Sequence, residues 1–161
     1  MIEMTVVGPD DWPTWRQLRL AALTEAPAAF GARLADWQGD GDTEQRWRER
    51  LAIPGSHNLV ASLDGRPAGM ASGVTWPTAT EVALTSMWVR PDARGRGVGD
   101  RLVDEVARWA KERGAHRVGL GVAPDNAAAI ALYRRSGFVP SDVPGKVLPD
   151  GVRAQVMFRQ L

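Results

Sequence analysis

The sequence predicts an α/β (α+β) fold in which helices flank a mixed central sheet. Residues 58–63 and 67–74 read as two strands joined by an Asp-Gly dipeptide, which supplies the positive φ angles of a tight hairpin turn. Strand-like residues 80–89 and 116–122 then enclose an amphipathic helix that begins at Val98. A hairpin followed by strand, helix, strand, helix and strand forms a mixed sheet with helices packed against it.

The first third of the chain is predicted to hold a short strand and two helices. Residues 2–7 alternate as in a strand, and residues 12–24 carry apolar side chains at helical spacing. Thr43 is a favourable N-cap for a second helix that ends at Leu51 and has Trp47 on its apolar face. The charged side chains expected to lie largely outside that face are Arg46, Arg48, Glu49 and Arg50.

Two further helices and a final strand are predicted in the second half of the chain. Apolar residues recur at helical spacing from Val98 to Trp109, and Gly114 provides the left-handed residue with which many helices end. Residues 126–136 form the next helix, and residues 153–161 form the last strand. Because prolines and glycines punctuate the segment between these two elements, it is read as a connection.

Length and composition exclude several classes of protein. A chain of 161 residues is long enough for one well-filled core, so we expect residues 1–161 to form a single domain. Its 20 basic and 19 acidic side chains leave a net charge of +1, which argues against nucleic acid as a partner. Without cysteine, and with His57 and His116 as the only imidazoles, no metal site is expected.

The beginning of the chain carries no targeting signal of a familiar kind. Residues 1–4 contain neither a basic segment nor the start of an apolar one, and no run approaches the ~20 apolar residues of a membrane span. We therefore expect a cytoplasmic protein that does not use a membrane as a partner.

The most informative segment runs from Val89 to Gly99 and reads V-R-P-D-A-R-G-R-G-V-G. Its glycines let backbone amides approach a ligand closely, and the helix that starts at Val98 adds its positive N-terminal end. This chemistry suits a pyrophosphate, and therefore a nucleotide-like ligand. The spacing of the glycines differs from the G-x-G-x-x-G of dinucleotide folds, and no Gly-Lys-Ser/Thr of a phosphate-binding loop follows.

Two motifs in this order resemble the GNAT family of N-acetyltransferases. The first is Arg94-x-x-Gly97-x-Gly99 after the strand that ends in Met-Trp-Val, and the second extends from Asn126 to Phe138. The resemblance implies a mostly antiparallel sheet with a V-shaped cleft between strands 4 and 5. It also implies acetyl-CoA as co-substrate, no metal, and direct transfer of the acetyl group to a primary amine.

The resemblance further assigns roles to individual residues. It implies that the main chain of residues 87–89 contacts the pantetheine arm, that residues 94–100 hold the pyrophosphate, and that Tyr133 protonates the departing sulfur. A backbone N–H near Met87, placed by a strand irregularity, would polarise the thioester carbonyl. The cofactor-binding residues expected on this basis are Met87, Trp88, Val89, Arg94, Gly95, Arg96, Gly97, Val98, Gly99, Asp100, Asn126 and Tyr133.

Each assignment has a structural alternative. The side chain of Trp88 also suits a core, Asn126 also suits a helix N-cap, and Tyr133 also suits a buried phenol. Asp100 departs from the expected chemistry, because a carboxylate in the first helical turn competes with an anionic ligand for the same positive end. Its side chain is therefore expected to point outward.

The motifs do not specify a general base. Relatives often carry a glutamate on the fourth strand at the positions of Ala83 or Thr85, and neither of these residues accepts a proton. Glu81 lies upstream on the same strand face and is either a catalytic base acting through water or a charge at the start of the strand. His57 is interpreted as a solvated loop histidine, and His116 as the start of a strand.

The sequence leaves the acceptor open. A small-molecule amine is the expected partner, and Trp37 and Trp76 either line its pocket or belong to the core. The alternatives are a protein or peptide N-acetyltransferase and a non-catalytic acyl-CoA-binding domain. A homodimer is compatible with each of these interpretations.

Overall fold

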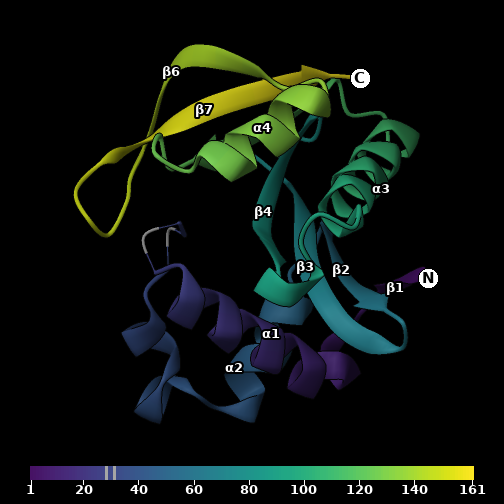
Figure 1. Cartoon of the computed structure of the whole chain (residues 1–161), viewed down its shortest axis with the longest axis vertical. Coiled ribbons are helices and arrows are strands. Elements are labelled where there is room, and N and C mark those ends of the chain that lie inside the picture. The colour runs from purple at the N-terminus through teal and green to yellow at the C-terminus, as the bar shows by residue number, and fades with distance from the viewer. Residues whose placement is uncertain (28, 31) are drawn as a thin grey trace.

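The computed structural model describes residues 1–27, 29–30 and 32–161. Within these residues seven strands form one sheet in the order β1-β2-β3-β4-β5-β7-β6, and all neighbouring pairs are antiparallel except β4 and β5 (Figure 1). The strands are β1 (Ile2–Val6), β2 (Ser56–Leu63), β3 (Arg66–Thr75), β4 (Glu81–Val89), β5 (Arg117–Val122), β6 (Val139–Val147) and β7 (Arg153–Gln160). The predicted mixed, mostly antiparallel sheet is confirmed.

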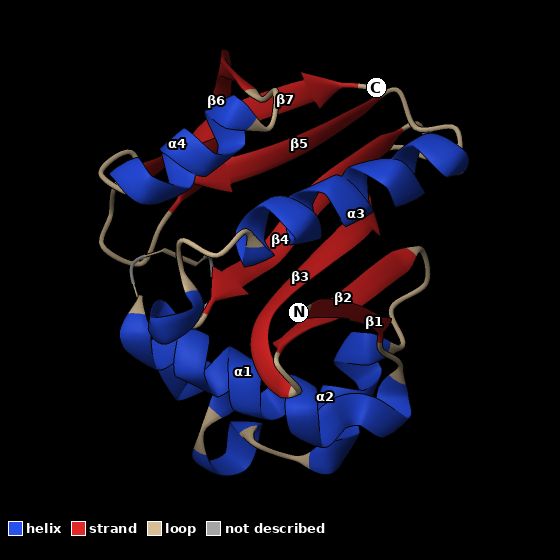
Figure 2. Ribbon diagram, turned by 45° about the vertical axis from the view of Figure 1, so that its right-hand side comes forward, coloured by secondary structure: helices blue, strands red, loops and turns tan. Residues whose placement is uncertain are grey.

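The helices cover both faces of this sheet. They are α1 (Trp12–Glu25), α2 (Glu44–Leu51), α3 (Val98–Glu112) and α4 (Ala127–Arg135). One core cluster joins α1 and α2 to Val60 and Met70, and the other joins α3 and α4 to Leu59 and Ala71. Since neighbouring residues of a strand point to opposite faces, the two pairs of helices lie on opposite sides, and Figure 2 shows α3 and α4 over the same side.

Local sequence signals account for most element boundaries. Asp64 and Gly65 both have positive φ angles, 53° and 82°, as the predicted turn between β2 and β3 requires. The Thr43 hydroxyl accepts a 3.3 Å hydrogen bond from the N–H of Arg46 and so caps α2. Gly114, with a φ of 83°, follows the end of α3.

Two sequence interpretations are wrong. The segment before β7 was expected to be a connection, but Val139–Val147 forms the edge strand β6, where proline is tolerated because one side of the strand has no partner. His57 is not a solvated loop residue, because it lies in β2 and stacks on Trp109 with ring centroids 4.9 Å apart. Burial lowers the pKa of this histidine.

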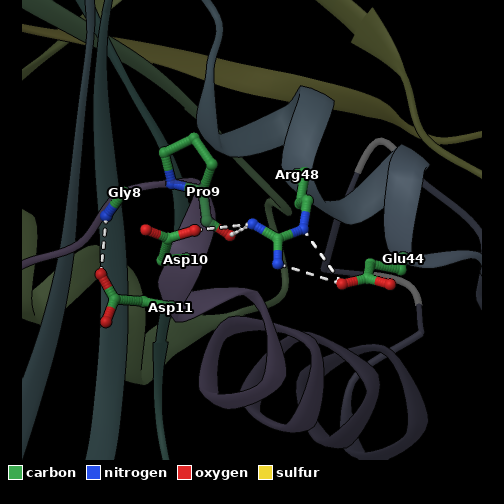
Figure 3. A network of polar contacts seen from close by, with 6 residues as sticks. All are labelled: Gly8, Pro9, Asp10, Asp11, Glu44 and Arg48. Atoms are coloured by element: carbon green, nitrogen blue, oxygen red, sulfur yellow. Dashed lines mark hydrogen bonds and ion pairs between the residues drawn. The ribbon is translucent and has the colours of Figure 1, made fainter.

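The charged face of α2 attaches this helix to the segment before α1. Figure 3 shows Arg48 reaching from α2 to Asp10 of the preceding turn and back to Glu44, with nitrogen–oxygen distances of 2.7 Å and 3.0 Å. Because these side chains are largely exposed, the pairs add little to the burial of Trp47 and Leu51, which holds α2 on the sheet. The same helix carries Arg50, two residues beyond Arg48.

Asp42 provides a second attachment and a testable pH dependence. Its carboxylate accepts hydrogen bonds from Arg16 of α1 and from the indole N–H of Trp47, at 2.8 Å and 2.7 Å. These bonds lower the pKa of Asp42 from 3.8 to about 2. The resulting stabilisation is complete above pH ~4 and is lost as the pH falls through about 2.

Asp42→Asn is accordingly expected to lower the melting temperature near pH 7, because asparagine loses the ion pair with Arg16. The difference from the parent should shrink between pH 4 and pH 2, as the parent itself becomes protonated. Circular dichroism melts across this range measure it, with Asp40→Asn in the same loop as control. A difference that stays constant with pH would contradict the assignment.

Candidate active site

The site begins where β4 and β5 separate. These parallel strands pair over residues 81–83 and 117–119, although both continue beyond that point. Figure 2 shows the two ribbons diverging from there, in agreement with the V-shaped opening that the resemblance implies. The backbone of β4 from Thr85 to Val89 is therefore not paired with β5.

A β-bulge interrupts β4 at the same place. Ser72 of β3 lies opposite Thr85, but Met70 lies opposite Trp88, so β4 contains one extra residue. Ser86 takes up this irregularity with a left-handed φ of 54°. The bulge reverses the alternation of the strand: Leu84 packs on the α3 side, whereas Trp88 packs on the α1 side.

The structure brings several predicted cofactor residues together beside this opening. A Cβ atom built on Gly99 would lie 3.1 Å from a methyl of Leu132 in α4, 3.4 Å from the Met87 methyl and 3.6 Å from a methyl of Val89. Gly99 therefore lets the start of α3 approach both β4 and α4. Any side chain at this position would crowd the space between these elements.

The start of α3 has the left-handed glycines on which the predicted anion site depends. Gly95 and Gly97 adopt positive φ angles of 76° and 86°, and Gly97 occupies the N-cap position without a side-chain cap. The first-turn amides of this helix of 15 residues thus face outward with the positive end of the helix dipole. Val98 is buried and anchors the turn.

The charged side chains of the same turn have protein partners. Arg94 lies 3.0 Å from Glu25 of α1, and Arg96 lies 3.7 Å from Asp64 in the β2–β3 turn. Asp100 points away from the helix N-terminus to Arg135 of α4, 2.9 Å away, as an outward carboxylate should. Both guanidinium groups are nevertheless about half exposed, so they can reach a ligand alongside the backbone amides of the turn.

Glu25 connects α1 to the turn and to β4. It accepts 3.0 Å hydrogen bonds from the indole N–H of Trp88 and from Arg94. Burial raises its pKa, but these two hydrogen bonds outweigh that effect and the net pKa is lowered. The side chain of Trp88 is thus a core residue whose main chain lies in the bulged segment.

The two residues singled out in the second motif are a helix cap, Asn126, and a phenol in the core, Tyr133. Asn126 caps α4, because its side-chain oxygen accepts a 3.2 Å hydrogen bond from the N–H of Ala129. Tyr133 is 7% exposed and contacts the ring of Phe138 edge-on, with centroids 5.8 Å apart. Burial raises its pKa well above 10, so the phenol keeps its proton at neutral pH.

Glu81 is not brought to the bulge. Its carboxylate forms an ion pair with Arg117, whose guanidinium lies 3.8 Å from the centre of the Phe158 ring. Glu81 and Met87 are six positions apart in β4, which corresponds to ~20 Å of extended strand. The structure therefore gives Glu81 a structural partner at the paired end of the strands and no support as a base.

Two arginines that the sequence did not single out lie near the bulge. Arg50 was expected outside the packed face of α2, but its guanidinium turns inward and donates to Asn58, Ser72 and Ser86. Arg19 of α1 is half-buried, and the charge of Arg50 acts on it. The available signal was the presence of Asn58 and Ser72 within otherwise apolar strands, since buried polar groups need partners.

The two tryptophans proposed for the acceptor pocket differ in placement. Trp37 packs against Trp47 with ring centroids 4.5 Å apart and lies beneath the guanidinium of Arg46. Trp76 is 62% exposed in the segment between β3 and β4. Trp37 is thus part of the α1–α2 layer, and Trp76 is a surface residue.

The sequence as a whole decides the family. A sequence profile described as the acetyltransferase (GNAT) family matches residues 12–138, which include both motifs. The chain belongs to this family. A relative from Pseudomonas aeruginosa named L-methionine sulfoximine/L-methionine sulfone acetyltransferase is 34% identical over 117 residues, or 68% of each chain. Other curated relatives match over 40% to 63% of their own length.

Solved structures agree with the fold of this GNAT protein. The ribosomal-protein-alanine N-acetyltransferase of Brucella melitensis superposes with a TM-score of 0.79 at 26% identity and covers 99% of both chains. YncA of Salmonella typhimurium, solved with acetyl-CoA, superposes with a TM-score of 0.78 at 24% identity, covering 100% of this chain and 94% of its own. Among the described residues, no helix is suited by length and apolarity to cross a membrane, and no cluster of metal-binding side chains occurs.

Proposed function

We propose that residues 1–161 form one N-acetyltransferase domain that transfers the acetyl group of acetyl-CoA directly to a primary amine of a small molecule. The observation that carries this proposal is the coincidence of three features. β4 parts from β5, β4 bulges at Ser86, and the glycine turn at the start of α3 packs against β4 and α4. Each feature suits one part of a CoA thioester.

The residues present fit acetyl-CoA. Its pyrophosphate would bind the amides after Gly95 and Gly97, where a Cβ would be strained, and its pantetheine arm would lie along residues 87–89. When bound, acetyl-CoA supplies the acetyl group as a thioester. The N–H of Met87 would donate to the thioester carbonyl oxygen, and the Tyr133 hydroxyl would give its proton to the sulfur.

Direct transfer is favoured over a covalent acyl-enzyme because the chain contains no cysteine. A small-molecule acceptor is supported by the relative named for L-methionine sulfoximine and L-methionine sulfone. The Brucella neighbour named for a ribosomal protein keeps a protein acceptor as the second candidate. Both candidates use the same cofactor site.

The proposal is tested by incubating the protein with acetyl-CoA and a panel of amines, and by measuring released thiol together with acetylated product. Thiol release that requires a small amine supports the proposal. Release with N-terminal peptides alone would favour the protein acceptor. Acetyl-CoA binding in calorimetry without release for any amine would indicate a non-catalytic acyl-CoA-binding domain.

Glu81→Gln tests the placement of the base. Because Glu81 pairs with Arg117 far from the bulge, we expect the profiles of kcat/KM against pH to coincide for parent and variant. In both proteins kcat/KM should rise with pH along the titration of the acceptor amine. A variant that is impaired near pH 7 and recovers at higher pH would restore Glu81 as the base.

A further inference from the structure

Two arginines that have no acidic partner in the described part of the chain lie on the α1–α2 side of the sheet. Arg19 comes from α1 and Arg50 from α2; both side chains are half-buried, Nη1 of Arg19 is itself buried, and the two are near enough for the charge of Arg50 to act on Arg19. Burial lowers the pKa of Arg19 to about 10, with a further contribution from the nearby charge of Arg50. Burial likewise lowers the pKa of Arg50.

No carboxylate among the described residues contacts either group. Arg50 donates to the neutral oxygens of Asn58, Ser72 and Ser86, at 3.1 Å, 3.0 Å and 3.3 Å. Arg19 lies over the ring of Phe30 at 4.8 Å, and its buried Nη1 has no acceptor within the described part of the chain.

Acids at the end of α1, before α2 and at its start are engaged with other arginines. Glu25 binds Arg94, Asp42 binds Arg16, and Glu44 binds Arg48. Two like charges that are partly buried without a counter-charge disfavour each other, and charges withdrawn from water are normally paired. An anion bound between them would supply the counter-charge and an acceptor for Nη1 of Arg19.

The position of the pair identifies where that anion would lie. Arg50 Nη2 is 3.3 Å from Ser86 Oγ, and Ser86 is the bulge residue directly before Met87. Because Ser86 and Met87 are consecutive residues, Arg50 lies close to the main chain that would hold the thioester, and the amine and carboxylate of an α-amino acid, joined through one carbon, are close together as well. An anion at the arginines would hold an amine on the same small molecule beside the bulge.

We propose that Arg19 and Arg50 bind the carboxylate of the acceptor, so that the acceptor is an amine with an adjacent carboxylate, of the free amino acid class. The planar guanidinium fork matches a carboxylate and adds charge-assisted hydrogen bonds. This inference rests on the proposed function, because it assigns the acceptor of the same site.

Matched acceptors test the inference. Leucine, phenylalanine and methionine are each compared with the amide and with the amine that lacks the carboxyl group. The acid should exceed its amide in kcat/KM by ~10- to 100-fold, the range of charge-assisted hydrogen bonds. O-phosphoethanolamine serves as the phosphate probe, and a preference for it over the amino acids would overturn the carboxylate assignment.

Arg19→Met separates a ligand-binding role from a structural one. The variant keeps an apolar stem and removes the charge, so the preference for the acid should fall at least ~10-fold while turnover of the amide is retained. The melting temperature should stay the same or rise. Equal loss with acid and amide, together with a lower melting temperature, would show a structural role and overturn the proposal.

Arg50→Lys and Arg153→Gln complete the set. Arg50→Lys keeps a charge but loses the fork, so the acid preference should decrease in part. Arg153 is exposed on β7, where it contacts the carbonyl of Gly145, and its variant should retain the full preference. An Arg153→Gln variant that lost the preference equally would overturn the assignment to Arg19 and Arg50.

The outcomes distinguish this inference from the proposed function. If the parent acetylates acids and amides equally, the transferase function holds and the carboxylate site is wrong. If no amine is acetylated, the melting temperature with free leucine is measured instead. A rise in the parent that is absent in Arg19→Met would support the carboxylate site without the transferase function. Absence of both turnover and Arg19-dependent stabilisation overturns the inference.

Discussion

Gly97→Glu is expected to abolish acetyl-CoA binding, with a Kd raised more than ~100-fold. Gly97 is the N-cap of α3 with a φ of 86°, a conformation that L side chains rarely adopt. The new carboxylate would also occupy the positive end of the helix and repel the pyrophosphate. Isothermal titration calorimetry with acetyl-CoA measures the effect.

Gly114→Glu is the matched control. Gly114 has a φ of 83° just beyond the end of the same helix, and a Cβ there meets nothing within 4 Å. The control therefore imposes similar backbone strain away from the proposed anion site, and its affinity for acetyl-CoA should equal that of the parent. If Gly97→Glu binds as tightly as the control, the cofactor site lies elsewhere.

Tyr133→Phe should lower kcat by about 10- to 100-fold while the KM for acetyl-CoA changes little. Burial keeps the phenol protonated, as a proton donor requires, but a thiolate is a tolerable leaving group, so the effect falls at the low end of acid catalysis. Steady-state and single-turnover kinetics on one good acceptor measure it.

Phe138→Leu distinguishes loss of the hydroxyl from disturbed packing. Phe138 contacts the Tyr133 ring edge-on, so its truncation loosens that ring but leaves the hydroxyl in place. We expect this variant to lose stability and to retain most of its kcat. An unchanged kcat in Tyr133→Phe, with chemistry shown to limit the rate, would make Tyr133 a core residue alone.

Much of the fold could be predicted because its signals are local. The Asp64-Gly65 turn, the Thr43 cap and the helix end at Gly114 each depend on a few neighbouring residues, and all three are present in the structure. The edge strand β6 was missed because its prolines read as breaks in a sequence. Proline is acceptable there only because β6 has a single neighbour, which is a property of the sheet.

In the candidate site, too, the features that could be predicted are those that depend on neighbouring residues. The glycine spacing from Gly95 to Gly99 predicted an anion-binding helix start, since a few adjacent residues suffice to set the φ angles and the free amides. Position on the strand also suggested Glu81 as a base. Pattern alone did not reveal that Arg117 pairs with it at the closed end of the opening.

The sequence by itself determined the family, the hairpin, the helix ends and the glycine turn, because each depends on residue types at short spacing. The resemblance implied a cleft between these strands and an irregularity near Met87, but only the tertiary structure places the parting after Ala83 and the bulge at Ser86, and only it shows that Arg50 turns inward beside the bulge. These features arise from contacts between segments far apart in the chain, such as Arg50 with Ser86, which are 36 residues apart. Side-chain periodicity specifies which face of an element is apolar, whereas the partner that each face meets depends on the packing of the whole sheet.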